Sequence, residues 1–430
     1  EDYALDLKEG YNSLRFTAVS PMIDPSSAVL YPLPDTMRVI GQEFQSPLSA
    51  QDLLTRSVGQ SVSLVRTLPD SGEQQSQRAR ILAVDGGLIL EIDGRYETEL
   101  AGRRIVYDSL PEGVLRPTLN VGIHSEAAGH PGVTLRYLSA GLSWSADYIV
   151  RLDRERSRFY LQATASVRNY SGSDLGASSV ELVAGSVNRE RKQAGFARVA
   201  MASAEADSAG SINPVALGDL HLYRLPGVLS LANNSVQQKV LFEAREVPYT
   251  QRYRLRSQPD IYFSPGLNEQ KLKVDSFIEF VNKANPASAE PSLGVPMPAG
   301  RVRLYARTED EKKSLRFVGE DRIDHTPKNE TLQLKTGQAF DLAAKRRQIA
   351  FRNLPVEHPY RQHNEIRLET EFSNAGEGAV AVEVREQFSG EWKMVDGPEP
   401  DSREARSASW TVQVPANGTS TLSFAVRVKR

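Results

Sequence analysis

Residues 159–168 read FYLQATASVR, and every odd-numbered position in this run is apolar while the even-numbered positions are mostly polar. Alternation of this kind places one face of an extended strand on a core and the other in water. The same pattern returns in residues 366–373 and 422–428. The spacing of three and four that a helix needs is almost absent, except in residues 49–56, where Ser49 is suited to cap a short helix. The sequence therefore predicts an all-β protein.

The length of 430 residues is more than one hydrophobic core usually serves, so we expect several small units of the β-sandwich or β-barrel type. Tight glycine turns at residues 85–87 and 93–94 are typical of hairpins in a small SH3-like β-barrel. The expected divisions are N-terminal strands that pair with a later sheet (1–46), the SH3-like barrel (47–115), a β-sandwich (116–191), a flexible linker rich in Ala, Ser and Gly (192–211), a β-rich central domain (212–352) and an immunoglobulin-like β-sandwich (353–430).

The charge balance argues against one class of partner. The 52 Lys and Arg residues nearly match the 54 Asp and Glu residues, which gives a formal net charge of −2 and no electrostatic reason to bind nucleic acid. The absence of cysteine excludes disulfides, thiolate nucleophiles and zinc held by cysteine. No apolar stretch approaches the ~18 residues of a membrane-spanning helix, and the polar start at Glu1 and Asp2 suggests that a signal peptide has been removed.

Three segments share a degenerate repeat in which an alternating strand ends in an asparagine and a small polar turn follows. The asparagines are Asn169, Asn282 and Asn374. Asparagine tolerates left-handed backbone and can hydrogen-bond its own turn. We interpret the repeat as a set of β-sandwich hairpins, with a shared ligand-binding asparagine as the alternative.

Residues 319–327 (GEDRIDHTP) form the most chemically loaded segment. Its candidate catalytic or metal-binding residues are Glu320, Asp321, Asp324 and His325. On an extended strand, Glu320 and Asp324 share one face. Asp321 and His325 share the other, so the four do not enter one active site unless the backbone bulges between them. We therefore predict a structural segment, in which Asp321 and His325 bond neighbouring backbone and Arg322 pairs with Glu320 or Asp324.

Other signals of chemistry are weak. The motifs G-x-S-x-G, G-x-x-x-x-G-K-[ST], G-x-G-x-x-G and H-E-x-x-H are absent. His358 and His363 flank Pro359, which breaks a helix, so they are not a helical pair of metal ligands. Trp144 alternates with apolar neighbours and is expected to pack in a core rather than stack on a sugar. We expect no cofactor and no metal.

Several phrases occur together and carry a family resemblance. They are residues 138–148 (LSAGLSWSADY), 295–305 (VPMPAGRVRLY), 319–327, 337–341 (GQAFD), 389–392 (SGEW) and 414–418 (VPANG). Together they resemble a bacterial family known as domain of unknown function 4139, which includes proteins named mucoidy inhibitor A-like. The resemblance covers most of the chain from about Asn12 onward. It implies an exported protein, periplasmic or secreted, and a short form without the additional N-terminal domain and coiled-coil insertion of longer members; it assigns no reaction and no site.

We expect a non-enzymatic protein of the bacterial envelope whose β-domains act as a scaffold or protein-interaction module. Its partner would be an unknown envelope protein or a second copy of itself. Two alternatives stay open: a hydrolase that acts on polysaccharide through Glu320, Asp321 and Asp324, and a surface or filament protein that assembles by exposed sheet edges. Catalytic carboxylates would converge in a cleft roughly 5 to 10 Å apart, whereas structural ones would pair with basic groups.

Overall fold

The structure of the protein is a computed structural model that describes residues 2–17, 19–69, 71–109, 115–177, 179–185, 215–217, 220–257, 259–266, 269–286, 291–307, 314–355 and 362–430. Within these ranges it holds thirty strands, one α-helix and one short 3₁₀ turn, so the prediction of an all-β protein is confirmed. Helix α1 (Ala50–Arg56) begins after Ser49, whose hydroxyl accepts from the backbone N–H of Asp52. The predicted linker, residues 192–211, lies outside the described residues.

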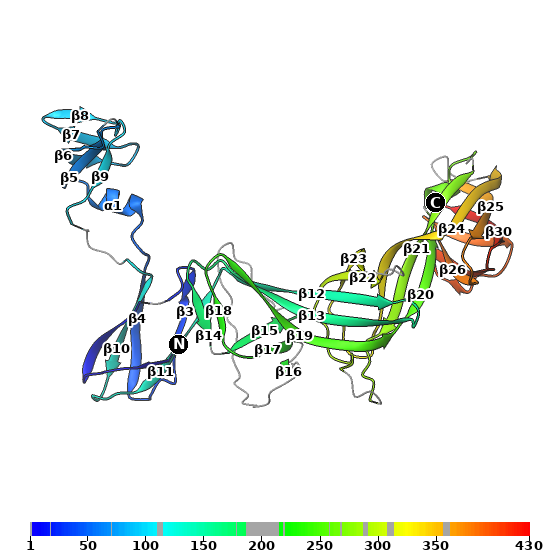
Figure 1. Cartoon of the computed structure of the whole chain (residues 1–430), viewed down its shortest axis with the longest axis horizontal. Coiled ribbons are helices and arrows are strands. Elements are labelled where there is room, and N and C mark those ends of the chain that lie inside the picture. The colour runs from blue at the N-terminus through cyan, green and yellow to red at the C-terminus, as the bar shows by residue number, and fades with distance from the viewer. Residues whose placement is uncertain are drawn as a thin grey trace.

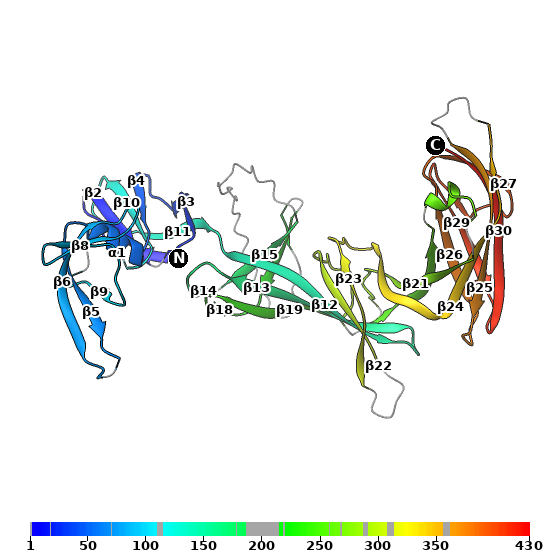
Figure 2. The same ribbon diagram turned by 90° about the horizontal axis from the view of Figure 1, so that it is seen from above.

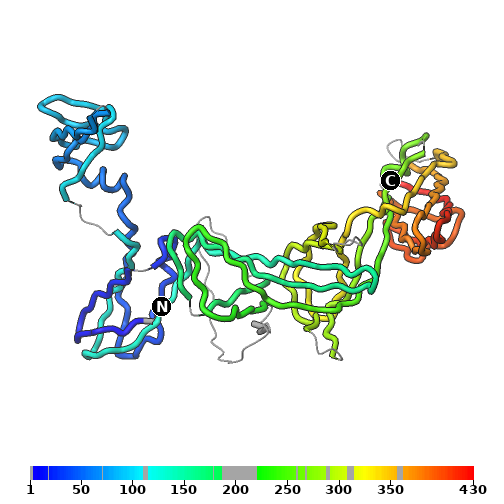
Figure 3. The backbone as a smooth tube through the Cα atoms, viewed as in Figure 1, coloured from blue at the N-terminus to red at the C-terminus, as the bar shows by residue number. Residues whose placement is uncertain are grey.

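The strands gather into four units along an elongated molecule (Figures 1 and 2). The first is a sandwich of two three-stranded sheets. One sheet has the order β1–β11–β3 and the other the order β2–β10–β4. Their bounds are β1 (Asp2–Ala4), β2 (Gly10–Phe16), β3 (Ile23–Tyr31), β4 (Met37–Gln45), β10 (Thr118–Ser125) and β11 (Gly132–Ser139). The chain thus leaves this sandwich after β4 and returns to it at β10, as the backbone trace shows (Figure 3).

A small five-stranded sheet is inserted between β4 and β10. Its order is β8–β7–β6–β5–β9, with bounds β5 (Ser61–Thr67), β6 (Gln74–Ala83), β7 (Ile89–Ile92), β8 (Arg95–Glu97) and β9 (Arg104–Val106). The expected SH3-like barrel is not closed, because β8 and β9 form opposite edges of the described sheet. Both edge strands are only three residues long, which leaves little backbone to close a barrel.

The central unit is built on a five-stranded sheet of order β19–β13–β12–β22–β23. Two small sheets, β14–β18 and β15–β17–β16, accompany it. The bounds are β12 (Leu142–Asp153), β13 (Arg158–Asn169), β14 (Leu175–Ala177), β15 (Val180–Ala184), β16 (Val215–Leu217), β17 (Leu220–Leu225), β18 (Leu229–Leu231), β19 (Ser235–Pro248), β22 (Gly300–Arg307) and β23 (Leu315–Ile323). The expected separate sandwich over 116–191 is therefore corrected. The apolar faces of β10 and β11 pack in the N-terminal core, whereas those of β12 to β15 pack with β17, β19 and β22.

The last unit is a nine-stranded sheet of order β27–β30–β25–β24–β21–β20–β26–β29–β28. It curls so that β25 and β30 face β26 and β29 across one core (Figure 2). The bounds are β20 (Thr250–Arg256), β21 (Gln270–Val281), β24 (Thr331–Asn353), β25 (His363–Asn374), β26 (Val380–Gln387), β27 (Glu391–Asp396), β28 (Ser402–Arg403), β29 (Ser407–Val414) and β30 (Gly418–Lys429). The 3₁₀ turn η1 (Pro259–Tyr262) also packs in this core.

The expected boundary at residue 353 is wrong, because two strands run through both the central and the C-terminal unit. In β21, Val274 is buried in the C-terminal core and Ile278 in the central core. In β24, Leu334 lies in the central core and Leu342 in the C-terminal one. The pairing of these two strands shifts register between the cores, near Gly337, whose φ of 134° suits glycine.

No helix within the described residues has the length and hydropathy needed to cross a membrane.

Candidate functional site

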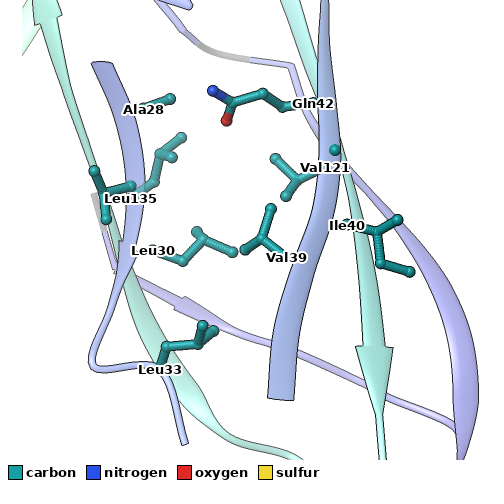
Figure 4. A pocket seen from close by; sticks show the side chains of 10 residues that line it. Ala28, Leu30, Leu33, Val39, Ile40, Gln42, Val121 and Leu135 are labelled. Carbon is teal, nitrogen blue, oxygen red and sulfur yellow. The ribbon is translucent and has the colours of Figure 1, made fainter. Parts of the chain in front are cut away.

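The two sheets of the N-terminal sandwich face each other along two edges, which we call seams, and one seam carries a groove. On the side of β1 and β2, the seam is filled by buried Leu5 and Leu7 and by the edge-to-face pair of Tyr3 and Phe16, whose ring centroids lie 4.7 Å apart. On the opposite side, between β3 and β4, a groove of about 340 Å³ enters the space between the two sheets (Figure 4).

The side chains that line the groove are mainly apolar. Its floor is made by Leu30, Val121 and Leu135, which are part of the sandwich core. At its rim stand Val29 and Ile40, whose exposed fractions of 58% and 56% are large for aliphatic side chains. The lining contains no charged residue, and among its side chains only that of Gln42 is polar. The floor residues are themselves buried, at 5% exposed or less, so the apolar surface that solvent meets belongs to the edge strands β3 and β4.

The local sequence explains why β3 and β4 do not close this seam. In β4, Ile40 has no partner on β10, because the register shifts between the pairs Gly122–Gly41 and Ile123–Val39. In β3, the four residues 25–28 lie opposite a single position of β11, between Arg136 and Leu138, so three of them are extra. Bulges bend a strand and increase its twist, so both edge strands curve where they would otherwise meet.

Gln42 marks one end of the groove. Its Nε2 donates to the carbonyl oxygen of Pro25 at 2.6 Å, which links β4 to β3 across the seam. At the other end, the backbone N–H of Met37 donates to Pro34 in the turn between the two strands. Leu33 lies in that same connection and lines the groove. The opening is therefore bounded at both ends.

The sequence-predicted candidates lie elsewhere, in and after β23, and they do not converge. Glu320 faces Arg303 and Arg301 of the neighbouring β22, with Oε to Nε distances of 3.2 and 3.7 Å. The expected pairing with the adjacent Arg322 is wrong, because Arg303 lies directly across the strand pair from Glu320. The Glu320 carboxylate therefore lies beside two arginines of the neighbouring strand.

Asp321 bonds backbone, as predicted. Its Oδ2 accepts from the N–H of Lys335 at 2.6 Å, which ties β23 to β24, and its Oδ1 accepts from the N–H of Arg322 at 2.8 Å. His325 also bonds backbone, since its Nδ1 accepts from Ala299 at 3.2 Å. The side chain of Asp324 is exposed.

No group of three or more His, Asp or Glu residues in the described part of the chain is placed to hold a metal ion.

The three repeat asparagines are buried and bond backbone. Asn169 and Asn374 each accept, through Oδ1, from the N–H two residues on and donate to the carbonyl four residues on. Each also donates to a remote carbonyl, that of Leu231 or Pro415. Asn282 also makes three hydrogen bonds, but to more distant backbone: its Nδ2 donates to the carbonyls of Val295 and Pro327, and its Oδ1 accepts from the N–H of Gly294. With amide and carbonyl both engaged, these side chains hold turns together rather than offer a ligand site.

A buried ionic cluster in the C-terminal core had no counterpart in the sequence expectations. The Arg346 guanidinium of β24 is bonded to both carboxylate oxygens of Glu386 of β26, and both side chains are almost fully buried, at 3% and 0% exposed. The hydroxyl of Tyr262 donates to Glu386 as well, and the Arg346 Nε donates to Thr370 at 3.0 Å.

The surroundings of this cluster raise the pKa values of Tyr262 and Arg346. Burial, and then the negative charge of Glu386, hold the pKa of Tyr262 well above its usual value, so the phenol stays protonated as a donor. Burial is the largest single influence on the pKa of Arg346 and would lower it, but the charge of Glu386, the interaction with Tyr262 and the hydrogen bond to Glu386 together raise the pKa. The signal in the sequence was the alternation Leu342, Ala344, Arg346, which places this arginine on the inward face.

A comparison of the chain with family models, curated proteins and solved structures found no match, so the functional argument rests on the geometry of the seam.

Proposed function

We propose that this chain is a non-enzymatic scaffold of the bacterial cell envelope, periplasmic or secreted, that binds another protein through the seam between β3 and β4. The observation that carries the proposal is the apolar groove, where the aliphatic side chains of Val29, Val39 and Ile40 are exposed beside the sandwich core. Contiguous exposed apolar surface on a folded chain marks an interaction site more often than scattered apolar side chains do. We propose the envelope location on the family resemblance of the sequence alone.

The architecture supports the role of a scaffold. The groove lies in the N-terminal sandwich, near one end of an elongated series of β units (Figure 1). Strands β21 and β24 contribute to two cores at once, which joins the central and C-terminal units more firmly than a single linker would.

The hydrolase alternative finds no support in the geometry of its candidate carboxylates. Glu320 is paired with arginines and Asp321 with backbone N–H groups, which is the arrangement expected of structural residues.

Affinity purification from the native envelope tests the proposal with a matched pair of variants. Val39→Asp places a charge in the groove at a side chain that is 41% exposed, so the fold should tolerate it. Val236→Asp is the control, because Val236 is also exposed, at 51%, but lies on β19 of the central unit. A protein that co-purifies with the wild type and Val236→Asp but not with Val39→Asp supports the proposal. Identical sets of co-purifying proteins for all three chains would reject it.

A further inference from the structure

The strand pair β22–β23 presents a second surface, on the face of the central sheet that is turned away from the core. Val302 and Leu304 of β22 are buried in the core, so the residues that alternate with them point outward. We call the outward-facing residues of this strand pair the outer ribbon. Cross-strand pairing sets them in three rows, namely Arg301 opposite Arg322, Arg303 opposite Glu320, and Tyr305 opposite Phe317.

The first row places two positive charges side by side. Arg301 and Arg322 lie directly opposite each other on antiparallel strands, an arrangement that is destabilising for like charges. Glu320 offsets this charge only in part, because its shorter contact, 3.2 Å, is to Arg303 and its contact to Arg301 is 3.7 Å. In the part of the chain that the structure describes, the side chain of Arg322 makes no ion pair.

The neighbouring strand β12 supplies one more carboxylate, that of Asp147. Its side chain is only 17% exposed and accepts a hydrogen bond from the Ser166 hydroxyl at 2.8 Å. Its ion-pair contact, at 3.6 Å, is again to Arg303. Both carboxylates near the outer ribbon thus make their shortest ion-pair contact with Arg303 rather than with the row of Arg301 and Arg322. A chain of net charge −2 therefore carries a local positive site in that row.

The third row is aromatic. The rings of Tyr305 and Phe317 pack edge to face with their centroids 5.7 Å apart, and Phe317 stays 58% exposed. Tyr305 lies four residues along β22 from Arg301, which corresponds to about 13 Å. Arginine and tyrosine are among the residue types enriched where a few side chains dominate the binding between two proteins. The outer ribbon thus offers a cationic contact and an aromatic contact on one face.

The order of the rows selects the occupant. A uniformly charged polymer, such as a polyuronate or a nucleic acid, carries anionic groups all along its length and would set charge against the row of Tyr305 and Phe317 as well. A protein segment can instead place a carboxylate at one end and an apolar side chain at the other. A carboxylate is also a group that a guanidinium binds through two parallel hydrogen bonds. Charge complementarity therefore favours an acidic protein segment.

We infer that the outer ribbon binds an acidic segment of a partner protein. An Asp or Glu side chain of that segment lies between Arg301 and Arg322, and an apolar side chain lies against Tyr305 and Phe317. The repulsion within the like-charged row is then relieved by the bound carboxylate. This surface belongs to the central unit and is separate from the groove of the N-terminal sandwich, so the inference goes beyond the proposed function.

A differential selection of displayed random peptides tests the inference. Peptides are selected on the whole wild-type chain and depleted on the double variant Arg301→Ser, Arg322→Ser. The surviving peptides should combine Asp or Glu with an aromatic or aliphatic residue. Their affinity should fall at least about tenfold in about 1 M salt, where the Debye length is about 3 Å, and by a similar factor in Phe317→Ser. Arg316→Ser is the matched control and should bind as the wild type does, because Arg316 is an exposed arginine of the same strand that lies opposite Ala306, on the other face of the sheet.

Thermal unfolding separates binding from a structural role. Because Arg322 faces a like charge, Arg322→Ser should leave the melting temperature of the free chain unchanged or raise it. A lower melting temperature would show that the row stabilises the sheet and would overturn the inference.

The inference is also overturned if no peptide survives the depletion, or if Phe317→Ser binds the surviving peptides as tightly as the wild type does. Polygalacturonate and single-stranded DNA serve as probes for the other anionic classes. If either probe binds in a manner that Arg322→Ser abolishes and Phe317→Ser leaves intact, the outer ribbon is a site for a charged polymer instead. These results would leave the proposed function standing, because that proposal fails only when groove variants change no association with envelope proteins.

Discussion

At the scale of single residues, the buried asparagines replace the hydrogen bonds that strands lose where they end. Asn374 is 4% exposed and serves three backbone groups, the N–H of Gly376 and the carbonyls of Gly378 and Pro415. Asn374→Ala leaves these groups without partners and should lower the free energy of unfolding by about 1 to 3 kcal/mol. Denaturant unfolding measures the change. Asn353→Ala, at an exposed strand end, is the control, and its free energy of unfolding should equal that of the wild type within experimental error. Equal losses of free energy in both variants would contradict this account.

The sequence could identify these asparagines but not their full set of partners. The turn that Asn169 and Asn374 each bond locally, as in residues 374–378, is visible in the sequence because the strand, the Asn and the small residues are contiguous. The second acceptor is remote: Leu231 for Asn169 and Pro415 for Asn374. Those contacts depend on which strands pack together, which periodicity does not encode.

The ionic cluster of the C-terminal core gives a second prediction at this scale. Glu386→Ala leaves the Arg346 guanidinium buried without its counter-charge, so the loss should be about 3 to 5 kcal/mol. Glu369→Ala removes the partner of Arg347, an arginine on the same strand whose side chain is more than half exposed, and should cost much less because water screens that pair. Thermal unfolding of the two variants compares them. Similar melting temperatures would show that the buried cluster contributes no more than a surface pair.

At the scale of elements, the segment 319–327 holds an edge strand in place through Asp321 rather than Asp324. Asp321→Ala removes the acceptor of the Lys335 N–H, where β23 meets β24, and should destabilise the protein by about 1 to 2 kcal/mol. Asp324→Ala alters an exposed side chain and should change stability by less than about 0.5 kcal/mol. Calorimetry of both variants decides the point. A larger effect at Asp324 would mean that its carboxylate has a role that the contacts of the folded chain do not explain.

Alternation predicted where strands occur, but not which strands pair. The parallel pair of β12 and β22 joins residues 146–152 to residues 300–306, more than a hundred positions away. Gly300 is a residue on which this pairing depends, because a Cβ there would lie 2.4 Å from the carbonyl oxygen of Ala146. The groove between β3 and β4 was missed for a related reason: its residues read as ordinary strand, and only the bulges and the missing neighbour of each edge open the seam.

At the scale of the whole molecule, two kinds of connection join the units. The central and C-terminal units share β21 and β24, so each core includes residues of strands that also belong to the other. The small five-stranded sheet has a core of its own, whose buried members run only from Val62 to Ile92. It enters and leaves the N-terminal sandwich at neighbouring positions, since Gln45 of β4 pairs directly with Thr118 of β10.

This geometry predicts that the inserted sheet can be removed without loss of the groove. Replacing residues 46–117 by Asn-Gly converts β4 and β10 into a two-residue hairpin, a loop length that suits paired antiparallel strands. The shortened protein should retain the calorimetric transitions of the other units. It should also retain the difference between Val39→Asp and Val236→Asp in co-purification, because no residue of the groove belongs to the removed segment. Aggregation of the shortened chain, or loss of that difference, would show that the inserted sheet supports the sandwich. In that case the inserted sheet would be needed to hold the edge of β4 in place, and the groove would depend on both units.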